Sequence, residues 1–295
     1  SVFLPFKNLK LLVIDEEHDQ SYKQPEKFKY NARDIGIVRA KSFDCPVVLG
    51  TATPSFETIH NVSIKKYKQH LLKSRYFKSP LPLVTIVDTS IDKPDEGLSK
   101  TLKDKMKIEL NKNNKVILFI GRRGFSNTVI CSECKTIVKC PKCDSNITYH
   151  KNVERLICHH CGFSQSFDSV KPCCENPCLV PLGIGTQRIE NRVKNLFPDK
   201  NILRVDSDNI SSKSDLKDFI KKANNNEIDI FIGTQMIAKG HDFPNLKLVG
   251  IVDSDVGLSG GDLRASERTF QVLQQVSGRS GRHSKKDEDK GVVLI

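Results

Sequence analysis

The sequence LLVIDEEHD, residues 11–19, changes from an apolar run to charged and titratable side chains at Asp15. Residues 11–14 contain the Val and Ile typical of a buried parallel strand. In sheets covered by helices on both faces, function collects at the carboxyl ends of the strands. There Asp15 suits Mg²⁺ binding through water, and Glu16 suits activation of a water molecule for nucleotide hydrolysis. A charged cap on a buried strand is the alternative.

Other short apolar runs have the same character, and polar residues or glycine follow each one. They are residues 47–49, 116–120, 228–232 and 246–252. Amphipathic stretches lie between these runs. Two sets of apolar residues each share one helical face: Leu102, Met106 and Leu110, and Phe270, Leu273 and Val276. Strands that alternate with helices predict an α/β fold with a parallel sheet.

The length and charge of the chain limit its class. With 295 residues, two or three compact units are expected. The chain has 47 Lys and Arg against 35 Asp and Glu, a net charge of +12, which favours a polyanionic partner such as nucleic acid. A soluble protein from a Lys-rich proteome is the alternative. Because no apolar run reaches about 18 residues and no secretory signal is seen, we expect a cytoplasmic protein without a membrane partner.

The cysteines are clustered, since nine of the ten lie between Cys131 and Cys178. Three CxxC pairs are clear: Cys131 with Cys134, Cys140 with Cys143, and Cys158 with Cys161. Each pair aims two thiolates at one point, and tetrahedral zinc needs two such pairs. The sequence therefore predicts two structural zinc ions. A redox-active or disulfide-bonded cluster is the alternative interpretation.

A fourth pair has to come from the run KPCCENPC, which is not a clean CxxC. Its cysteines are Cys173, Cys174 and Cys178, so one of the three is spare. We expect Cys174 and Cys178 to be the ligands, and Cys173 with Cys178 is nearly as good.

Small hydroxyl residues follow the second apolar run in GTATPS, residues 50–55. Thr51 and Thr53 can bond to the carboxylates of the first motif and so relay the state of the nucleotide. A plain turn between strand and helix would also use Gly, Thr and Pro.

Two further motifs follow later runs. In GTQMIAKGHDFPN, residues 233–245, Thr234 and backbone amides can bind a nucleic-acid phosphate. In QVSGRSGR, residues 275–282, Arg279 and Arg282 can stabilise charge on a transferring phosphoryl group. A basic, flexible helix end is the alternative for the second motif.

The order DEEH, TAT, GTQM and QxxGRxGR is that of superfamily 2 helicases. Together with the cysteine block and the phrases DEEHDQSYKQPEKFKYNARD, LFIGRRGF and GGDLRASERTFQVLQQVSGRSGR, it resembles the PriA family of replication-restart DNA helicases along practically the whole chain. The resemblance implies two RecA-like parallel-sheet motor domains, the first incomplete, with a small zinc-binding insertion in the second. We expect the first domain in residues 1–87, a linker in 88–100, the second domain in 101–130 and 181–295, and the insertion in 131–180.

The resemblance also implies roles for individual residues. The catalytic set is Asp15, Glu16, Arg279 and Arg282. The nucleotide-binding set is Glu17, His18, Thr51, Thr53, Gly240 and Gln275. The DNA-binding set is Tyr22, Lys23, Phe28, Tyr30, Arg33, Thr234 and Gln235, of which the first five belong to an aromatic-rich loop that senses DNA. The first and last cysteine pairs would share one zinc ion and the middle two pairs the other.

The implied function is that of an ATP- and Mg²⁺-dependent 3′-to-5′ DNA helicase in replication restart and primosome assembly at stalled forks. Its partners would be forked or single-stranded DNA, primosome proteins and single-strand-binding proteins, with the helicase itself a monomer. No GxxxxGK[ST] phosphate loop occurs in the chain. We therefore expect the N-terminal region with this loop and the C-terminal domain to be missing, and ATP hydrolysis by this polypeptide alone to be poor. A non-enzymatic zinc and nucleic-acid binding fragment is the alternative function.

Overall fold

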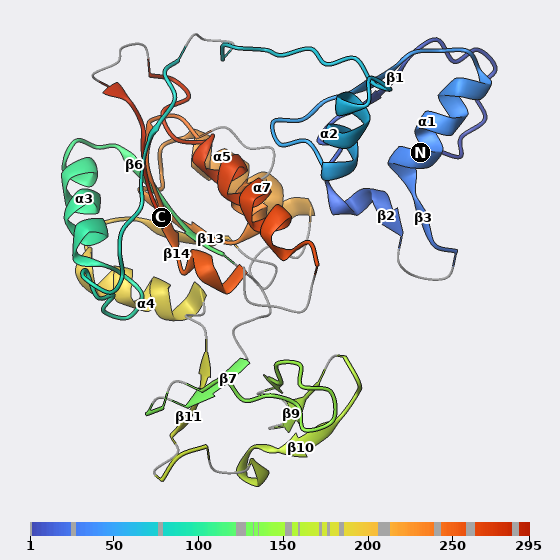
Figure 1. Ribbon diagram of the computed structural model, residues 1–295. Coiled ribbons are helices and arrows are strands. Elements are labelled where there is room, and N and C mark those ends of the chain that lie inside the picture. The colour runs from blue at the N-terminus through green and yellow to red at the C-terminus, as the bar shows by residue number, and fades with distance from the viewer. Residues whose placement is uncertain are drawn as a thin grey trace. The chain divides into compact units, whose positions relative to one another are not determined.

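The computed structural model divides into two compact units, Ser1–Lys73 and Ser74–Ile295 (Figure 1). The residues that it describes are 2–24, 28–75, 79–121, 128–131, 133–134, 136–150, 155–158, 160–170, 173–175, 178–182, 186–205, 213–238, 243–257, 263–284 and 289–295. Within these ranges no helix has both the length and the apolar character needed to cross a membrane.

The first unit is built on two parallel strands, β1 (Leu12–Ile14) and β4 (Val47–Leu49). The chain between them contains η1 (Gln20–Tyr22), the antiparallel pair β2 (Lys23–Gln24) and β3 (Tyr30–Asn31), and helix α1 (Ala32–Ser42). Helix α2 (Phe56–Ser63) follows β4. Because β1 and β4 are parallel and in register, their carboxyl ends deliver the motifs at Asp15 and Thr51 to the same sheet edge.

The second unit contains a parallel sheet, which among the described residues has six strands in the order β12-β13-β6-β14-β15-β5. Their bounds are β12 (Ile202–Val205), β13 (Ile230–Gly233), β6 (Lys115–Ile120), β14 (Leu246–Val252), β15 (Val292–Leu294) and β5 (Leu83–Thr85). The central strand β6 is buried throughout, and its residues alternate between two apolar clusters. Leu118 packs in the cluster of α3 (Lys100–Asn111) and α4 (Thr186–Leu196), and Phe119 in that of α5 (Lys213–Asn224) and α7 (Ala265–Ser277). Helices therefore cover both faces of this sheet (Figure 1).

The two predicted helical faces had different outcomes. Leu102, Met106 and Leu110 are all buried on α3, which confirms the first face. On α7, Val276 is buried and Leu273 is partly buried, but Phe270 is 58% exposed, so this part of the prediction is wrong. The reason is that Glu267 and Gln271 are the buried residues of the first half of α7, which turns Phe270 outward.

The expected boundary at residue 87 and the expected linker need correction. Strand β5 pairs in parallel with β15, so residues 83–85 belong to the sheet of the second unit. Within the expected linker, Leu98 is fully buried in the core cluster of α3. The carboxylate of Asp92 accepts hydrogen bonds from the backbone N–H groups of Lys100 and Thr101, both at 2.8 Å. Residues 88–100 are therefore an ordered part of the second unit, because they cap and cover α3.

The cysteine-rich segment forms an antiparallel sheet, with five strands among the described residues, in the order β10-β9-β8-β7-β11. Their bounds are β7 (Thr128–Cys131), β8 (Thr148–His150), β9 (Arg155–Ile157), β10 (Ser164–Ser166) and β11 (Leu179–Leu182), with η2 (Phe167–Ser169) after β10. Strands β7 and β11 pair with each other, so the segment begins and ends side by side. It lies between β6 and α4 in the chain and has its own small core. The predicted α/β fold with a cysteine-rich insertion in the second domain is confirmed.

Candidate functional site

The carboxyl end of β1 places two acidic residues at the sheet edge. The backbone of Glu16 has a φ of 47°, and its N–H donates to Asp15 Oδ1 at 2.9 Å. Gly50, at the end of β4, leaves room for this carboxylate, because a Cβ atom there would lie 3.2 Å from Asp15 Oδ1. Asp15 is exposed, so its carboxylate is accessible at the edge.

His18 connects the first motif to the second. Its Nδ1 lies 2.7 Å from Thr51 Oγ1, and this oxygen also accepts a hydrogen bond from the Thr53 N–H at 3.0 Å. The same Nδ1 lies 3.6 Å from Glu16 Oε2. Among the described contacts, His18 lies between Glu16 and Thr51. The sequence suggested instead a direct hydrogen bond between a threonine hydroxyl and a carboxylate of the first motif.

Two oxygen atoms at this edge are buried without a hydrogen-bond partner in the described part of the chain. They are Glu16 Oε2 and Thr53 Oγ1. Buried polar atoms are nearly always hydrogen-bonded, so orphaned ones indicate water or a ligand. Together with the exposed carboxylate of Asp15, this donor set fits a hydrated Mg²⁺, which prefers oxygen ligands and keeps several waters.

Glu17 and Arg33 form a buried ion pair. Arg33 Nη1 donates to Glu17 Oε2 at 2.8 Å and to Ser55 Oγ at 2.9 Å, and the Ser55 N–H donates to Glu17 Oε1 at 2.7 Å. Burial lowers the pKa of Arg33, but its hydrogen bonds to Asp34 and Glu17 outweigh that effect and raise it. The resemblance implies nucleotide contact for Glu17 and DNA contact for Arg33. In the structure these two side chains are instead buried and bonded to each other.

The residues expected to sense DNA lie in and around η1, β2 and β3, with Tyr22 in η1, Lys23 on β2 and Tyr30 on β3. Phe28 is 74% exposed, and its ring centroid lies 6.1 Å from that of Tyr30, which in turn lies 5.2 Å from that of Phe3. Lys23 is exposed on β2. Tyr22 is tied to the sheet edge, because its hydroxyl donates to the Asp15 carbonyl at 2.7 Å. Burial and the charges of Asp15, Asp19 and Glu16 raise the pKa of Tyr22, so its hydroxyl stays protonated as a donor.

In the second unit, the third motif follows β13. A Cβ atom at Gly233 would lie 2.4 Å from the Val205 carbonyl, so strand β12 can approach only glycine here. Thr234 is buried, and its Oγ1 has no hydrogen-bond partner among the described residues. Gln235 begins the short helix α6 (Gln235–Ala238). Gly240 lies outside the described residues.

The fourth motif forms the end of α7 and the turn after it. Gln275 lies in the last turns of α7, Arg282 is exposed, and Arg279 is half-buried. A buried hydrogen bond connects this turn to β14, because Ser280 is fully buried and its hydroxyl donates to the Lys247 carbonyl at 2.9 Å. Gly281 adopts a φ of 64°, which favours glycine.

Sequence reasoning missed Arg75 as a part of this turn. Its guanidinium donates to the carbonyls of Gly278 and Ser280, each at 3.4 Å. Burial and the nearby Arg282 lower the pKa of Arg75. No motif surrounds Arg75, so the sequence offers no signal for this contact.

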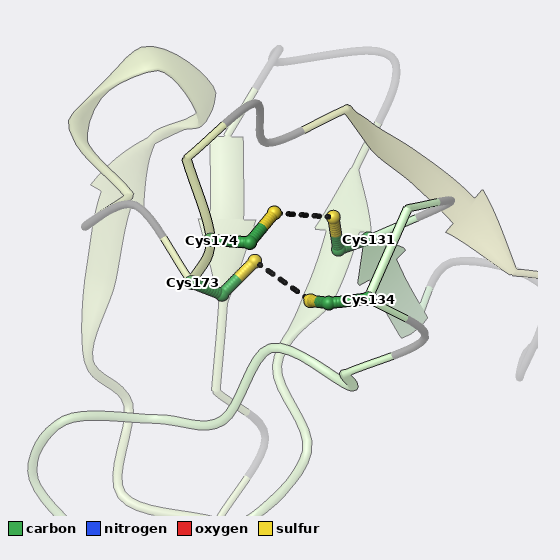
Figure 2. A group of neighbouring side chains, drawn as sticks. All are labelled: Cys131, Cys134, Cys173 and Cys174. Atoms are coloured by element: carbon green, nitrogen blue, oxygen red, sulfur yellow. Dashed lines mark hydrogen bonds between the residues drawn. The ribbon is translucent and has the colours of Figure 1, made fainter.

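The cysteines form two groups of four, and within each group all ligand atoms lie within 4.8 Å of one another in the described part of the chain. One group is Cys131, Cys134, Cys173 and Cys174, whose side chains point toward one another (Figure 2). The other is Cys140, Cys143, Cys158 and Cys161. These groups agree with the pairing that the resemblance implies, first with last and middle with middle.

The geometry of both groups suits tetrahedral zinc. Neighbouring sulfur atoms lie 3.6 and 3.5 Å apart in the first group and 3.5 and 3.4 Å apart in the second. Zinc bound to four thiolates at about 2.3 Å would separate the sulfurs by about 3.8 Å. None of the ten cysteines forms a disulfide in the structure. The residues present therefore fit two zinc ions.

The ligand set expected for the last pair needs correction. Cys173 takes the place expected for Cys178, because the chain turns so that the sulfurs of Cys173 and Cys174 both face Cys131 and Cys134 (Figure 2). Cys178 is exposed next to β11 and is not a member of the group. Sequence spacing could not decide this, because two adjacent cysteines do not form a CxxC.

Backbone amides prepare one thiol of each group for metal binding. The N–H of Cys134 bonds to the Cys131 thiol and lowers its pKa to about 6. The N–H of Ser145 bonds to the Cys143 thiol and lowers its pKa to about 6 as well. Thiolates are the metal-binding form, so these two sulfurs are ready to bind near neutral pH.

Comparisons with known protein families match two parts of the chain. Residues 140–165 match the PriA DNA helicase Cys-rich region (CRR) domain, and residues 185–284 match the helicase conserved C-terminal domain. Among solved structures, S. cerevisiae Dbp5 bound to RNA and ADP BeF3 is similar with a TM-score of 0.47 and 15% identity, covering 99% of this chain and 54% of that chain. This similarity is too low to carry an argument, so the fold is assigned from the sheet topology.

Curated relatives match the chain from end to end. The replication restart protein PriA of Rickettsia conorii is 46% identical over 298 residues, which cover 100% of this chain and 45% of that protein. The corresponding proteins of Haemophilus influenzae and Bacillus subtilis are 41% and 39% identical, and the matches cover 98% and 97% of this chain but 40% and 36% of those proteins. The chain thus spans less than half the length of these relatives. With a whole-chain match at this identity and a PriA-specific cysteine region, the chain belongs to the PriA family.

Proposed function

We propose that this chain is part of an ATP-dependent replication-restart DNA helicase, contributes residues for ATP hydrolysis and binds zinc, and hydrolyses ATP poorly on its own because it has no GxxxxGK[ST] phosphate loop. The observation that supports this most is the edge of the first sheet. There, two parallel strands bring Asp15 and Glu16 to the same edge as Thr51 and Thr53, and His18 Nδ1 is hydrogen-bonded to Thr51 and lies 3.6 Å from Glu16 Oε2. An acidic pair coupled to hydroxyl groups at a strand end suits phosphoryl transfer to water.

In this proposal each residue of the edge has one task. Bound Mg²⁺-ATP would supply the reacting phosphoryl group. Asp15 would hold the metal ion through water, and Glu16 would orient the attacking water with its buried Oε2, which has no hydrogen-bond partner among the described residues. Thr51 Oγ1 connects His18 to the Thr53 N–H, and His18 Nδ1 faces Glu16 Oε2 at 3.6 Å.

The second unit contains the remaining residues to which family membership assigns a role. We assign Arg279 and Arg282 to charge stabilisation on the phosphoryl group, and Gln275 and Gly240 to nucleotide binding. Thr234 and Gln235 would contact a DNA phosphate. Thr234 Oγ1 is buried and has no hydrogen-bond partner among the described residues. This supports the binding of a ligand group at the end of β13.

The cysteine-rich insertion would hold two structural zinc ions, one in each group of four thiols. Closed sites of four thiolates stabilise small folds and leave no open coordination position. The small core of this segment supports a structural role, because few apolar side chains are available to hold its strands together.

The remaining properties of the proposed helicase come from family membership. We propose 3′-to-5′ translocation, action at stalled forks, and partners among forked or single-stranded DNA, primosome proteins and single-strand-binding proteins. A monomer in the cytoplasm fits these tasks. The net charge of +12 supports the DNA partner, and it predicts that binding weakens steeply with salt.

The test uses the full-length protein that contains these residues. The variant Glu16→Gln should lose DNA-stimulated ATP hydrolysis while it keeps zinc content and single-stranded DNA binding. Asp44→Asn is the matched control, because Asp44 is an exposed carboxylate on the loop before β4. Equal rates of ATP hydrolysis by Glu16→Gln and Asp44→Asn would contradict the proposed role of Glu16 in hydrolysis.

A non-enzymatic zinc and nucleic-acid binding protein is the second candidate. The observation in its favour is that no GxxxxGK[ST] phosphate loop occurs in these 295 residues. Full-length wild-type protein that binds DNA but never hydrolyses ATP would support this second candidate.

A further inference from the structure

The second unit begins with a short segment, residues 74–80, which we call the connector. The structure describes four of its residues, at positions 74, 75, 79 and 80. The side chains of Arg75 and Ser79 bond to the turn that follows α7, residues 278–282, which carries the arginines of the fourth motif. Arg75 is half-buried and Ser79 is 6% exposed, so these contacts are partly shielded from water.

Three carbonyl groups of the turn accept hydrogen bonds from the connector. Arg75 Nη2 donates to the Gly278 carbonyl and Arg75 Nη1 to the Ser280 carbonyl, each at 3.4 Å. The Ser79 hydroxyl donates to the carbonyl of Arg282. The connector therefore holds the backbone of the turn at its beginning, its middle and its end.

A guanidinium suits the start of this turn, because the turn is also the end of helix α7. Gly278 caps α7, and the last carbonyls of a helix lack partners within it and carry partial negative charge. The Gly278 carbonyl also accepts a hydrogen bond from Arg282 Nε at 3.3 Å. Burial and the charge of Arg282 lower the pKa of Arg75, so the two guanidinium groups lie close together. Their shared carbonyl offsets part of the repulsion between them.

The turn is attached to the parallel sheet as well. The Ser280 hydroxyl donates to the Lys247 carbonyl and the Gly281 N–H donates to the Leu246 carbonyl, each at 2.9 Å. A Cβ atom at Gly291 would lie 2.1 Å from Ser280 Oγ, so only glycine fits there. Because the sheet holds the turn independently, loss of the connector contacts should shift the turn locally without unfolding it.

We propose that Arg75 and Ser79 position Arg279 and Arg282 for phosphoryl transfer by anchoring the connector to the turn. The inference rests on the proposed function, because it requires that these two arginines stabilise charge on the phosphoryl group. Arg75 and Ser79 are positioning residues, since they bond to carbonyls of the turn and need not touch the nucleotide. A displacement of about 1 Å in a group that acts on the reacting atoms can cost about a hundredfold in rate.

The experiment compares two nucleotide states of the full-length protein in the presence of oligo-dT. Fluorescent ADP with aluminium fluoride imitates the transferring phosphoryl group, and a fluorescent, non-hydrolysable ATP analogue imitates the ground state. Arg75→Gln should weaken the binding of ADP with aluminium fluoride by about tenfold or more. It should change the dissociation constant of the ATP analogue by less than about twofold, because uniform binding is not affected.

Two milder variants separate positioning from a general loss of structure. Ser79→Ala removes a single hydroxyl group and should weaken the binding of ADP with aluminium fluoride in the same selective way. Arg75→Lys should bind this complex more tightly than Arg75→Gln, because an ammonium still donates to one carbonyl at the helix end but lacks the guanidinium fork. If Arg75→Gln does not fold, these two variants decide the question.

Arg192→Gln is the matched control. Arg192 lies on α4 in the same unit, and its guanidinium is paired with Asp95 and Glu96 instead of the turn. Its variant should bind both nucleotide states as the wild type does.

The possible outcomes separate the inference from the proposed function. The inference is overturned if Arg282→Gln loses affinity for ADP with aluminium fluoride while Arg75→Gln and Ser79→Ala keep it. Equal weakening of both nucleotide states by these two variants would overturn it too, because a loss of folded protein affects both states alike. Wild-type affinity in Arg279→Gln and Arg282→Gln would instead refute the role that the proposed function gives to these arginines.

Discussion

The Nδ1 of His18 lies 2.7 Å from the Oγ1 of Thr51, although 33 residues separate them in the chain. Strands β1 and β4 create this contact, because their parallel pairing ends both strands at the same edge. Thr51→Val removes the hydroxyl and keeps the shape of the side chain. We expect ATP turnover by the full-length protein to fall about tenfold with little change in KM, since about 1.4 kcal/mol of transition-state positioning is a tenfold effect.

Thr51→Ser is the control for this prediction, because it keeps the hydroxyl. It should retain most of the turnover, measured by steady-state phosphate release in the presence of DNA. If Thr51→Val and Thr51→Ser turned over ATP equally well, the hydrogen bond to His18 would have no part in hydrolysis.

The buried pair of Glu17 and Arg33 predicts a non-additive effect on stability. Removal of one partner leaves the other charge buried without compensation and should cost about 3–5 kcal/mol in the free energy of unfolding. We therefore expect Glu17→Met and Arg33→Met each to be strongly destabilising. The double variant should be more stable than either single variant, because it buries no lone charge.

Urea denaturation of the three variants and the wild type measures this cycle. Arg39→Met serves as the control, because Arg39 has its contacts elsewhere on α1 and should be additive with Glu17→Met. Additive costs for Glu17→Met and Arg33→Met would mean that the two side chains do not depend on each other.

Much of the second sheet could be predicted, because its hydrophobic runs form buried strands. The runs of the first unit also form strands, but they are not buried throughout, since Val13 on β1 and Val48 on β4 are 59% and 50% exposed. The alternation along β6 and the face formed by Leu102, Met106 and Leu110 both follow from local periodicity. Phe270 could not be placed this way. Its outward orientation depends on the burial of Glu267 and Gln271, and a hydrophobic pattern cannot predict the burial of polar residues.

The site was predictable where a motif brings residues together and unpredictable where tertiary contacts do. The acidic residues of DEEH share an edge with the threonines because their strands pair, as expected. The partner of Glu17 is Arg33, and the sequence separates them by 16 positions without any repeating spacing. In the same way Arg75 reaches the turn at Gly278 across 203 residues.

The two cysteine groups predict the metal content of single-cysteine variants. We expect about two zinc equivalents in wild-type protein. Cys173→Ser should lose one, because Cys173 Sγ lies 3.5 Å from Cys134 Sγ within the first group. Cys178→Ser is the matched control from the same run and should keep both. Inductively coupled plasma mass spectrometry of purified, full-length protein gives the count.

Loss of zinc from Cys178→Ser, with both zinc ions kept by Cys173→Ser, would restore the ligand pair that the spacing first suggested. Cys140→Ser tests the second group in the same experiment. It should remove one zinc ion independently of Cys173→Ser, since the two groups share no ligand.

Asp92 predicts a pH-dependent contribution to stability from the segment before α3. Hydrogen bonds from Thr101 and from the Lys100 N–H lower the pKa of Asp92 from its ordinary 3.8 to about 2. Because the pKa is lower in the folded state, the stabilisation is fully present above about pH 4 and is lost as the pH falls through about 2. Asp92→Asn should therefore be less stable than wild type at pH 7, and the difference should shrink between pH 4 and pH 3.

Asp104→Asn is the control, because Asp104 is an exposed aspartate on α3. Urea midpoints at pH 7, 4 and 3 measure the effect, and a difference that grows on acidification would show that the carboxylate of Asp92 does not cap the helix.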